Sequence, residues 1–437
     1  MFLKCRVCGV QIRGLMGRRS SGSRAQSSRA VAPIRHGRLL TSNPVAAIAK
    51  LLAAMIAVIA VSSGAVTAFA VYDAVSASGP GIHLAHLPGA PSVKAAPAVG
   101  PIDGEVNLLL AGSDTRTAQV GYQTKAELAG SSGAGNNDVT MLLHVSADHS
   151  SATVVSFPRD LVSIPLCGKG ISSAMFNSTL ARGLSCTVQT VEKMTGLSIP
   201  YAAIITFNGV TGMSNAVGGV TVCLATPVKD DYTDPQLNLP AGQQTLVGDT
   251  ALSFLRSRHG VGDGSDLGRI SNQQVFLSAL TRKITGEGVL GNPITLYKLA
   301  NSALSNMHFS DTLNPTTLVS IALALKGIDL HKIVFLQYPT VADTADPNRV
   351  IPSTGPAAAL VAALKADQPI SLTGKLGRAA VADPTAASAA PAPAAPAPTA
   401  SGSAAPSITA TPAPTSIALP SAITGQSADQ NTCTSNK

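Results

Sequence analysis

The most constraining feature of the sequence is an uncharged apolar run of 21 residues from Leu51 to Val71, LLAAMIAVIAVSSGAVTAFAV. A helix that rises about 1.5 Å per residue can cross a hydrocarbon core of about 30 Å with a run of this length. We therefore predict a transmembrane helix over residues 51–72. The alternative is a cleaved signal peptide, because residues 68–70 (Ala-Phe-Ala) fit a small-x-small cleavage site, but the apolar part of a signal peptide usually spans only about 7 to 15 residues.

Basic residues are concentrated before this run. Residues 1–50 contain ten Lys or Arg and no Asp or Glu, which leaves 21 basic and 23 acidic residues for the rest of the chain. The positive-inside rule places this basic leader in the cytoplasm, and everything after about residue 73 outside the cell membrane, with a single crossing. Because the rest of the chain is nearly neutral, a basic nucleic-acid-binding face on the folded domain is disfavoured.

Two segments of biased composition flank the part of the chain that can fold. Residues 73–100 are rich in Gly, Pro, Ala and Ser and are predicted to form a linker. Residues 373–437 are dominated by Ala, Pro, Ser and Thr, so we expect a disordered or polyproline-like tail. Residues 101–372 then form a single extracytoplasmic domain.

Within residues 101–372, short β-branched or Leu-rich runs alternate with helical patterns, which indicates an α/β fold. Ser185 is a candidate cap for a helix that follows it, and Pro293 and Pro315 suit first helical positions. Strands are expected at 106–111, 139–145, 152–157, 202–206, 220–224 and 333–336. Helices are expected at 187–195, 249–256, 270–284, 293–305 and 315–325.

The cysteines divide by compartment. Cys5-x-x-Cys8 lies in the cytoplasmic leader and has no second pair that would complete a zinc site. The other four lie outside, where disulfides persist. A bridge between Cys167 and Cys186 would close a loop of about 20 residues and contribute about 3 kcal/mol in the chain-entropy description. We predict this bridge, and the partners of Cys223 and Cys433 remain open.

Polar residues gather where apolar strands are expected to end or begin. Asp114 and Arg116 follow the first strand in the sequence NLLLAGSDTR, and Asp138 begins the second. The third strand ends in Phe-Pro-Arg159-Asp160. Ligands of α/β proteins gather at the carboxyl ends of strands. Each acid alone could be a turn residue, but several such clusters together favour a binding site.

The most polar cluster is residues 251–274, ALSFLRSRHGVGDGSDLGRISNQQ. Arg256 and Arg258 precede a Gly-rich loop, and Arg269 and Gln273 share one face of the next helix. Guanidinium groups bind phosphate oxygens through paired hydrogen bonds and never lose their charge. The cluster therefore predicts a site for adjacent phosphates, and solvated surface charge is the alternative.

Several motifs occur in an order that is similar to that of a known family. They are GSDTR, D-x-T-M-L-L-H-V, S-F-P-R-D-L-V-S-I-P, N-A-V-G-G-V-T-V, L-x-G-x-x-A-L-x-F-x-R-x-R-H and DGSDLGRISNQQ. Over residues 103–286 the chain resembles the LytR-CpsA-Psr family. The resemblance implies an α/β/α sandwich with a lipid-holding apolar pocket, after a single N-terminal transmembrane helix. It also implies an Mg²⁺-dependent extracytoplasmic phosphotransferase that attaches a glycopolymer from a polyprenyl-pyrophosphate lipid carrier to peptidoglycan.

The resemblance also implies roles for individual residues. It implies that Asp114 and Asp138 bind the metal, and that these two acids, Arg258 and Asp266 form the catalytic group. In two positions the chain departs from the family pattern: Asn136 and Asn272 stand where many members have arginine. The pyrophosphate-binding positions implied by the resemblance are Arg159, Arg256, Arg258, Arg269 and Gln273.

Two alternatives follow from the residues that match. The proton of an acceptor hydroxyl could be taken by Asp266 or by Asp160. A protein that keeps the arginines but lacks turnover would be a membrane-anchored binder or regulator that recognises polyprenyl-pyrophosphate lipids. Asn136 and Asn272 favour the binder slightly, whereas retention of Asp114 and Asp138 favours the enzyme.

Overall fold

The computed structural model describes residues 81–89, 100–120, 128, 135–286, 306–384 and 416–436. These residues belong to the second of the two compact units into which the chain divides, Gly64–Lys437. The predicted leader, the predicted transmembrane helix and the helix expected at 293–305 lie outside the described residues. Within the described ranges, no helix is both long and apolar enough to span a bilayer.

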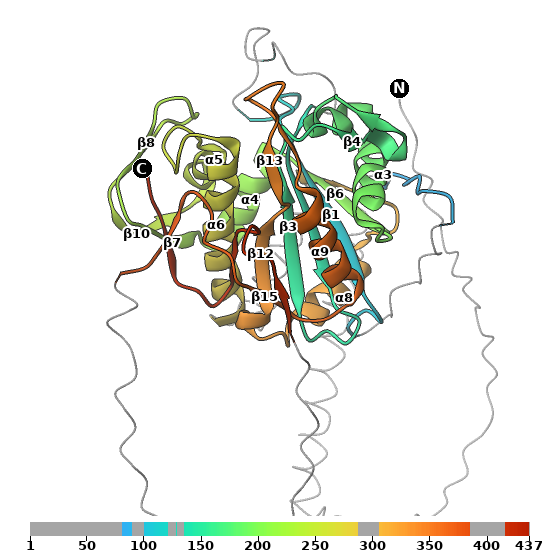
Figure 1. Cartoon of the computed structure of the whole chain (residues 1–437). Helices are drawn as coiled ribbons and strands as arrows, with labels where there is room; N and C mark the ends of the chain where they lie inside the picture. Colours follow the sequence, from blue (N-terminus) through green and yellow to red (C-terminus); the bar gives the residue numbers. More distant parts are fainter. Residues whose placement is uncertain are drawn as a thin grey trace, which may run out of the picture. The chain divides into compact units, whose positions relative to one another are not determined.

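The described part of the chain forms a mixed central sheet of seven strands in the order β11-β6-β1-β2-β3-β12-β18 (Figure 1). β1 is parallel to β6, and β3 is parallel to β12, while β2 runs antiparallel between β1 and β3. The carboxyl ends of β1, β3, β6 and β12 therefore meet at one edge. The bounds are β1 (Val106–Ser113), β2 (Asn137–Val145), β3 (Ala152–Phe157), β6 (Tyr201–Ile205), β11 (Met307–Phe309), β12 (Ile333–Gln337) and β18 (Gly425–Ser427).

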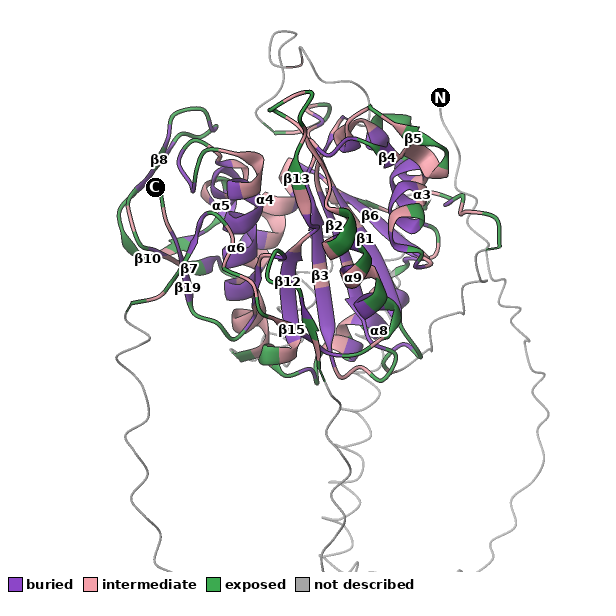
Figure 2. Ribbon diagram, viewed as in Figure 1, coloured by how far each residue is buried: buried purple, intermediate pink, exposed green. Residues whose placement is uncertain are grey.

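Alternation along the strands gives the sheet two apolar faces. Leu109 of β1 packs with α3 (Leu184–Thr195) and α9 (Thr354–Lys365), whereas its neighbour Leu108 packs with α8 (Pro315–Leu325) on the opposite face. Successive side chains of a strand point to opposite faces, so a strand in the middle layer must be apolar on both. Figure 2 shows the central strands as largely buried. The predicted α/β fold is confirmed, with helices on both faces of the sheet.

A smaller sheet of four strands lies beside the central one, in the order β10-β7-β19-β16. Its apolar residues form a third core with α5 (Gly248–Arg256) and α6 (Asp266–Gly286). The four strands are β7 (Val220–Leu224), β10 (Gly242–Leu246), β16 (Ala380–Ala382) and β19 (Thr432–Thr434). The remaining elements are α4 (Phe207–Ala216), β4 (Ile164–Pro165), β5 (Ile171–Ser172), β8 (Val228–Asp230), β9 (Leu237–Leu239), β13 (Thr340–Ala342), β14 (Val350–Pro352), β15 (Ile370–Leu372), β17 (Ile417–Leu419) and the 3-10 turns Leu166–Gly168, Phe176–Arg182 and Leu330–Lys332.

The prediction of a disordered tail over 373–437 is wrong for residues 373–384 and 416–436. The first of these segments supplies β16, and the second supplies β17, β18 and β19. Leu419 and Ile423 are buried in the main core. These few apolar residues suffice because the segments pair with strands that are already formed, a long-range effect that composition does not reveal. Residues 385–415 lie outside the described residues.

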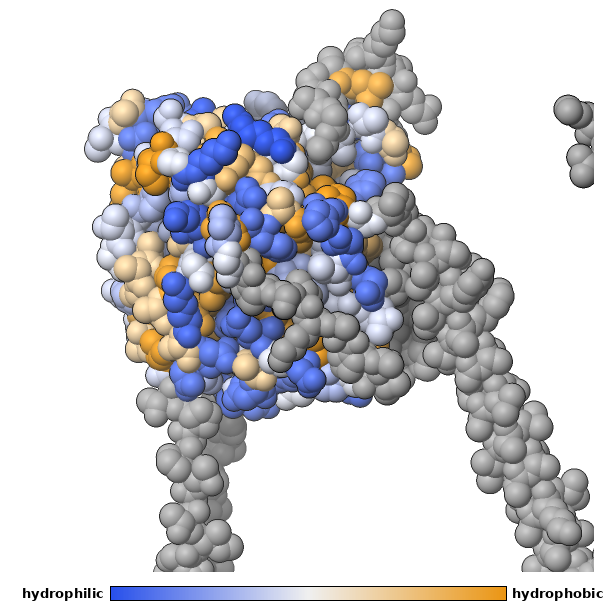
Figure 3. Space-filling view, turned by 90° about the vertical axis from the view of Figure 1, so that its right-hand side faces the viewer, coloured by the Kyte–Doolittle hydropathy of each residue, from blue (hydrophilic) through white to orange (hydrophobic). Residues whose placement is uncertain are grey.

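The linker prediction is also wrong in part, because residues 81–89 pack along α3. Leu84 is 4% exposed and belongs to the main core. Glu192 of α3 accepts hydrogen bonds from the backbone N–H of Leu87 and contacts His86 Nδ1 at 3.0 Å. Figure 3 turns this side of the molecule toward the viewer and shows hydrophilic and hydrophobic residues interspersed on it, as on most domain surfaces.

Most of the expected strands and helices within the described residues are present, with ends that shift by a few residues. The cap prediction for α3 is wrong: Gly183 occupies the N-cap position, and Ser185 Oγ instead accepts a hydrogen bond from the N–H of Ala85. At α8, Asn314 caps the helix by accepting from the N–H of Thr317. The sequence analysis missed the helices α4 and α9, whose Gly- and Ala-rich sequences lack a clear apolar stripe.

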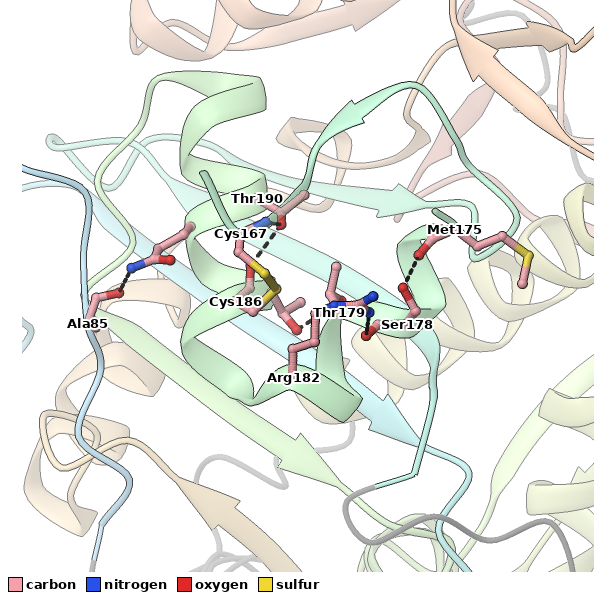
Figure 4. The surroundings of a disulfide bond; sticks show 10 residues. Ala85, Cys167, Met175, Ser178, Thr179, Arg182, Cys186 and Thr190 are labelled. Atoms are coloured by element: carbon pink, nitrogen blue, oxygen red, sulfur yellow. Dashed lines mark hydrogen bonds between the residues drawn. A yellow bond between two sulfur atoms is a disulfide. The ribbon is translucent and has the colours of Figure 1, made fainter. Parts of the chain in front are cut away.

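Two disulfides join Cys167, Cys186, Cys223 and Cys433. Cys167 and Cys186 form the predicted pair, and Figure 4 shows this bridge between the 3-10 turn after β4 and α3. Thr190 Oγ1 accepts a hydrogen bond from the N–H of Cys167 and donates to the carbonyl of Cys186. The second bridge joins Cys223 of β7 to Cys433 of β19, residues 210 apart in sequence. It fastens the C-terminal strand to the smaller sheet.

Candidate active site

The two predicted metal-binding acids lie at the same end of the β1–β2 pair. Gly112 pairs with Val139 but Ser113 pairs with Asn137, so Asp138 is the extra residue of a β-bulge. Bulges re-aim side chains and are frequent near active sites. The carboxylate of Asp114 accepts hydrogen bonds from the backbone and side-chain amides of Asn136. Asn136, one of the two departures from the family pattern, therefore orders the carboxylate of Asp114.

Gly135 allows this close approach of the strand ends. It has φ +75°, and a Cβ there would overlap Asp114 Oδ1 and Ser113 Oγ. A side chain in this left-handed conformation would be strained and would also displace the Asp114 carboxylate. The glycine therefore lets the chain turn directly over the carboxylate before it enters β2.

Arg159 connects the bulge to the helical layer. It follows β3, and its Nη1 donates to Asp138 Oδ1 at 2.7 Å. Its backbone N–H donates to Oδ2 of Asp266, the first residue of α6, at 3.3 Å. Asp138 comes first among the charges that raise the pKa of Arg159, and these charges outweigh burial, which acts in the opposite direction. The guanidinium is therefore held charged beside Asp138.

Asp266 is the point on which three arginines converge. Its Oδ1 lies 2.5 Å from Arg269 Nη2, 3.6 Å from Arg258 Nη2 and 3.9 Å from Arg159 Nε. Arg269 Nη2 also donates to the backbone carbonyl of Asp138 at 2.7 Å. A carboxylate in the first turn of α6 is further favoured by the helix dipole. Asp266 thus holds three guanidinium groups together that would otherwise repel one another.

The cluster has a buried and an exposed part. The side chains of Asp266 and Arg269 are 7% and 5% exposed, whereas those of Arg159, Arg258 and Asp138 are 24%, 26% and 28% exposed. The pKa of Arg258 is lowered by burial and by the neighbouring charges of Arg269 and Arg159. A nearby anion would relieve that repulsion. Arg159 and Arg258 are consequently the guanidinium groups best placed to meet a ligand.

Asp160, which directly follows Arg159, has a raised pKa. Burial is the main cause and the charge of Asp266 adds to it, against the opposing effect of the arginines. Arg349, in the loop between β13 and β14, approaches Asp160 Oδ1 at 3.7 Å. The sequence analysis did not find Arg349, because nothing in its local sequence marks it and only the fold brings it to this edge.

Asp230, at the end of β8, was also missed and orders the turn that carries Arg258. Its Oδ2 accepts from Ser257 Oγ at 2.6 Å and from the N–H groups of Arg258 and Gly260 at 3.1 and 3.3 Å. Burial would raise the pKa of Asp230, but these bonds and one from the N–H of Tyr232 outweigh it and lower the pKa. The ionised carboxylate therefore fixes the backbone of the turn.

The remaining predicted phosphate ligands do not join the ion-pair cluster. The guanidinium of Arg256 stacks on Phe207 of α4, 4.3 Å from the ring centroid, and its Nη1 is buried without a hydrogen-bond partner. Gln273 Nε2 donates to the carbonyl of Leu255 and so ties α6 to α5. Of the five predicted pyrophosphate-binding side chains, Arg159, Arg258 and Arg269 are brought together.

The second departure from the family pattern, Asn272, also has a structural role. It is fully buried and donates from Nδ2 to the carbonyl of Phe254. Its Oδ1 accepts from Thr434 Oγ1 of β19. An arginine there would need room between α5 and the C-terminal strand, so the asparagine matches this packing and lies away from the exposed arginines.

The bulge residues have the donor chemistry of a magnesium site. Mg²⁺ takes oxygen ligands, usually one or two protein carboxylates together with waters and substrate phosphates. Asp138 pairs with Arg159 through Oδ1, which leaves Oδ2 for a metal. Asp114 receives two hydrogen bonds from Asn136, fewer than the roughly four lone-pair sites of a carboxylate. The two acids on adjacent strands therefore fit the ion.

Residues 85–365, well over half of the chain, match the LytR_cpsA_psr family. The chain therefore belongs to the LytR-CpsA-Psr family. The match extends to residues 287–365, where the sequence resemblance was weak, and includes β12, α9 and the loop of Arg349.

Relatives of known name show similarity over part of their length. The chain is 30% identical over 269 residues to "Cell wall biosynthesis protein LcpA" of Corynebacterium glutamicum, covering 55% of this chain and 51% of that protein. It is 32% identical over 149 residues to the "Polyisoprenyl-teichoic acid--peptidoglycan teichoic acid transferase TagU" of Bacillus cereus, covering 34% and 47%. The matched region spans about half the length of these relatives.

Two solved structures match the chain at low sequence identity. The "LytR-Csp2A-Psr enzyme from Actinomyces oris" is 21% identical, with a TM-score of 0.47 over 65% of this chain and 96% of that one. The structure of Bacillus subtilis TagT is also 21% identical, with a TM-score of 0.46 over 65% of this chain and 99% of that one.

Proposed function

We propose that this protein is an extracytoplasmic phosphotransferase that attaches a glycopolymer from a polyprenyl-pyrophosphate lipid carrier to peptidoglycan. The observation that supports it most directly is the convergence of Arg159, Arg258 and Arg269 on Asp266, beside the acids of the β-bulge. Guanidinium groups recognise phosphate oxygens in pairs and stay charged. Two of them are partly exposed, so adjacent phosphates can reach them.

In this proposal the site orients the lipid pyrophosphate and compensates its negative charge. A pyrophosphate diester is already activated, so the protein needs mainly to orient it and to stabilise charge on the leaving phosphate. In our proposal Arg159 and Arg258 bind the phosphates. Asp266 and Arg269, which are more deeply buried, hold these two arginines in position. Asp114 and Asp138 would hold Mg²⁺, which when bound neutralises phosphate charge.

The acceptor hydroxyl needs a base, and the contacts favour Asp160 over Asp266. Asp266 is 7% exposed and lies close to three guanidinium groups, so it is poorly placed to take a proton. Asp160 is more exposed, at 19% of its side chain, and its raised pKa, due first to burial, makes it a stronger base than an ordinary aspartate. Asp160 is therefore assigned the proton in this proposal, and Asp266 the positioning of the arginines.

The direct test is transfer. The purified full-length chain is incubated with labelled lipid-linked glycans and a peptidoglycan acceptor, with and without Mg²⁺, and labelled peptidoglycan is measured. Transfer that depends on Mg²⁺ supports the proposal. Tight binding of the lipid pyrophosphate without any transfer would instead support the binder or regulator. Among the described residues, Asn136 and Asn272, the two positions that favoured a binder, both have structural partners and so lend that second function no support.

Membrane anchorage is part of the same proposal. A lipid carrier is confined to a bilayer, so the domain would act from a transmembrane helix at 51–72, with residues 1–50 cytoplasmic. External protease on intact cells should then leave only the leader and helix protected. Recovery of a mature form that begins near Val71 would show a cleaved signal peptide instead.

A further inference from the structure

The opposite end of the β1–β2 pair carries a second group of ligand-type side chains that the proposed transfer does not use. Glu105 precedes β1, His144 is the next-to-last residue of β2, and Asp367 follows α9. One nitrogen of His144 and one carboxylate oxygen of each acid all lie within 4.8 Å of one another. We infer that this trio is a binding site for a first-row transition-metal dication of the Zn²⁺ type.

The hydrogen bonds around His144 determine which ring nitrogen is available. Asn107 Nδ2 donates to the carbonyl of Ser198, so Asn107 Oδ1 is the acceptor for His144 Nδ1 at 2.8 Å. In the neutral ring this puts the proton on Nδ1 and the lone pair on Nε2, which faces Asp367. Metal-binding histidines commonly donate their other N–H to such an oxygen, which fixes both tautomer and ring orientation.

One carboxylate oxygen of Asp367 accepts a hydrogen bond and the other does not. Its Oδ2 accepts from the N–H of Ala147 at 2.9 Å. Its Oδ1 is buried, lies 3.3 Å from His144 Nε2 and has no hydrogen-bond partner. The backbone of Asp367 is left-handed, with φ +54°, a conformation that costs energy for a non-glycine residue. A buried carboxylate oxygen that faces the lone pair of His144 Nε2 is energetically unfavourable by itself, and a bound cation would satisfy both atoms.

The spacing fits a metal. Ligands about 2.0–2.1 Å from a tetrahedral ion are about 3.4 Å apart, close to the 3.3 Å between His144 Nε2 and Asp367 Oδ1. Glu105 is exposed and can turn to complete a third position, and water can take the fourth. The site includes the imidazole of His144, whose side chain is only 6% exposed, and zinc-like ions prefer imidazole whereas Mg²⁺ prefers oxygen ligands. The site therefore differs in metal preference from the acids of the bulge. The ion would tie α9 to β1 and β2.

The test is metal binding by the purified full-length chain with Cys5→Ser and Cys8→Ser, which removes the other plausible zinc ligands in the leader. Zn²⁺ titrated calorimetrically should bind one-to-one with a dissociation constant of about 10 μM or below, and Mg²⁺ should not compete. Glu105→Gln and Asp367→Asn should each weaken binding at least about tenfold, whereas Asp329→Asn, the same charge change on an exposed residue, should not. Cobalt should give visible absorption bands that both variants lose.

Two outcomes would overturn the inference. One is the absence of Zn²⁺ binding below millimolar concentration in the parent. The other is binding that Glu105→Gln and Asp367→Asn leave unchanged, which would place the metal elsewhere. A bound ion should also raise the thermal midpoint of the parent by about 5 °C or more at a hundredfold excess over the dissociation constant, and at the same Zn²⁺ concentration the shift should fall to about half or less in both variants. None of these measurements uses glycan transfer, so they stand or fall independently of the proposed function.

Discussion

The two ends of the β1–β2 pair differ in the charges that meet there. At the carboxyl end of β1, the charges of Asp138 and Asp266 are compensated by three arginines. Arg159 follows β3, Arg258 lies in the turn after α5, and Arg269 belongs to α6. At the amino end, Glu105 and Asp367 meet one buried imidazole. The first arrangement suits an anion held over a metal, and the second suits a cation. One rigid strand pair can thus present two chemistries, provided different helices supply the rest of each site.

Removing Asp114 or Asp138 should have the largest effect, and it should affect only the proposed transfer site and leave the other end of the β1–β2 pair unchanged. Asp114→Ala or Asp138→Ala should reduce transfer at least about a thousandfold and abolish its Mg²⁺ dependence, because the metal would lose half of its protein ligands. Lipid binding and Zn²⁺ binding at the other end should persist. Transfer and thermal melts are measured together to show that the variants fold. A double variant that transfers glycan at the parent rate would disprove the metal assignment.

Asp160 provides the next largest effect. Asp160→Asn should lower the rate of transfer about a hundred- to ten-thousandfold, the usual contribution of a general base. Since burial and Asp266 raise the pKa of Asp160, the parent should lose activity as the pH falls, beginning at a higher pH than for an ordinary aspartate. The pH–rate profile of the parent checks this. An acid limb that persists unchanged in the residual activity of Asp160→Asn would assign the base elsewhere.

Arg258 tests recognition rather than turnover. Arg258→Ala should weaken binding of lipid pyrophosphate about ten- to a hundredfold, since a charge-assisted hydrogen bond contributes about 1.5 to 3 kcal/mol. Arg258→Lys should rescue only in part, because an ammonium cannot span two phosphate oxygens. Arg182→Ala, which removes an exposed arginine that donates to the backbone carbonyl of Ser178, is the control. Equal binding of pyrophosphate and monophosphate lipids by parent and Arg258→Ala would mean the arginines are surface charge.

Asp230→Asn should have the smallest effect on lipid binding, because Asp230 acts only through the turn that carries Arg258. Asp230→Asn loosens the turn of Arg258 and should cost about 1 to 3 kcal/mol of stability at neutral pH, with a few-fold weaker lipid binding. Because the pKa of Asp230 is lowered on folding, its contribution is present above the pKa of the unfolded chain and is lost as pH falls through the folded value. Melts of parent and variant from pH 7 to pH 2 should therefore converge at low pH. A constant difference would show that its charge is not what matters.

Local sequence predicted much of the fold. The apolar runs of β1 and β3, and the Asn-Pro start of α8, carry their signals within a few residues, and these elements are present. The C-terminal segment defeated the same reasoning, because β18 and β19 have few apolar residues and depend on partners about 90 and 210 residues away. Strand pairing over such distances is invisible to composition.

The candidate site, like the fold, has features that the sequence predicted and features that it did not. The sequence by itself determined the residue types, two acids at strand ends and arginines around a glycine-rich turn, which are the kinds of groups that magnesium ions and phosphates prefer. Only the tertiary structure decided which of them meet. It buried Asp266 beneath three arginines, turned Arg256 onto Phe207, and brought Arg349 to Asp160. The physical reason is that charge interactions depend on distance and burial, and both are set by packing between elements far apart in the chain.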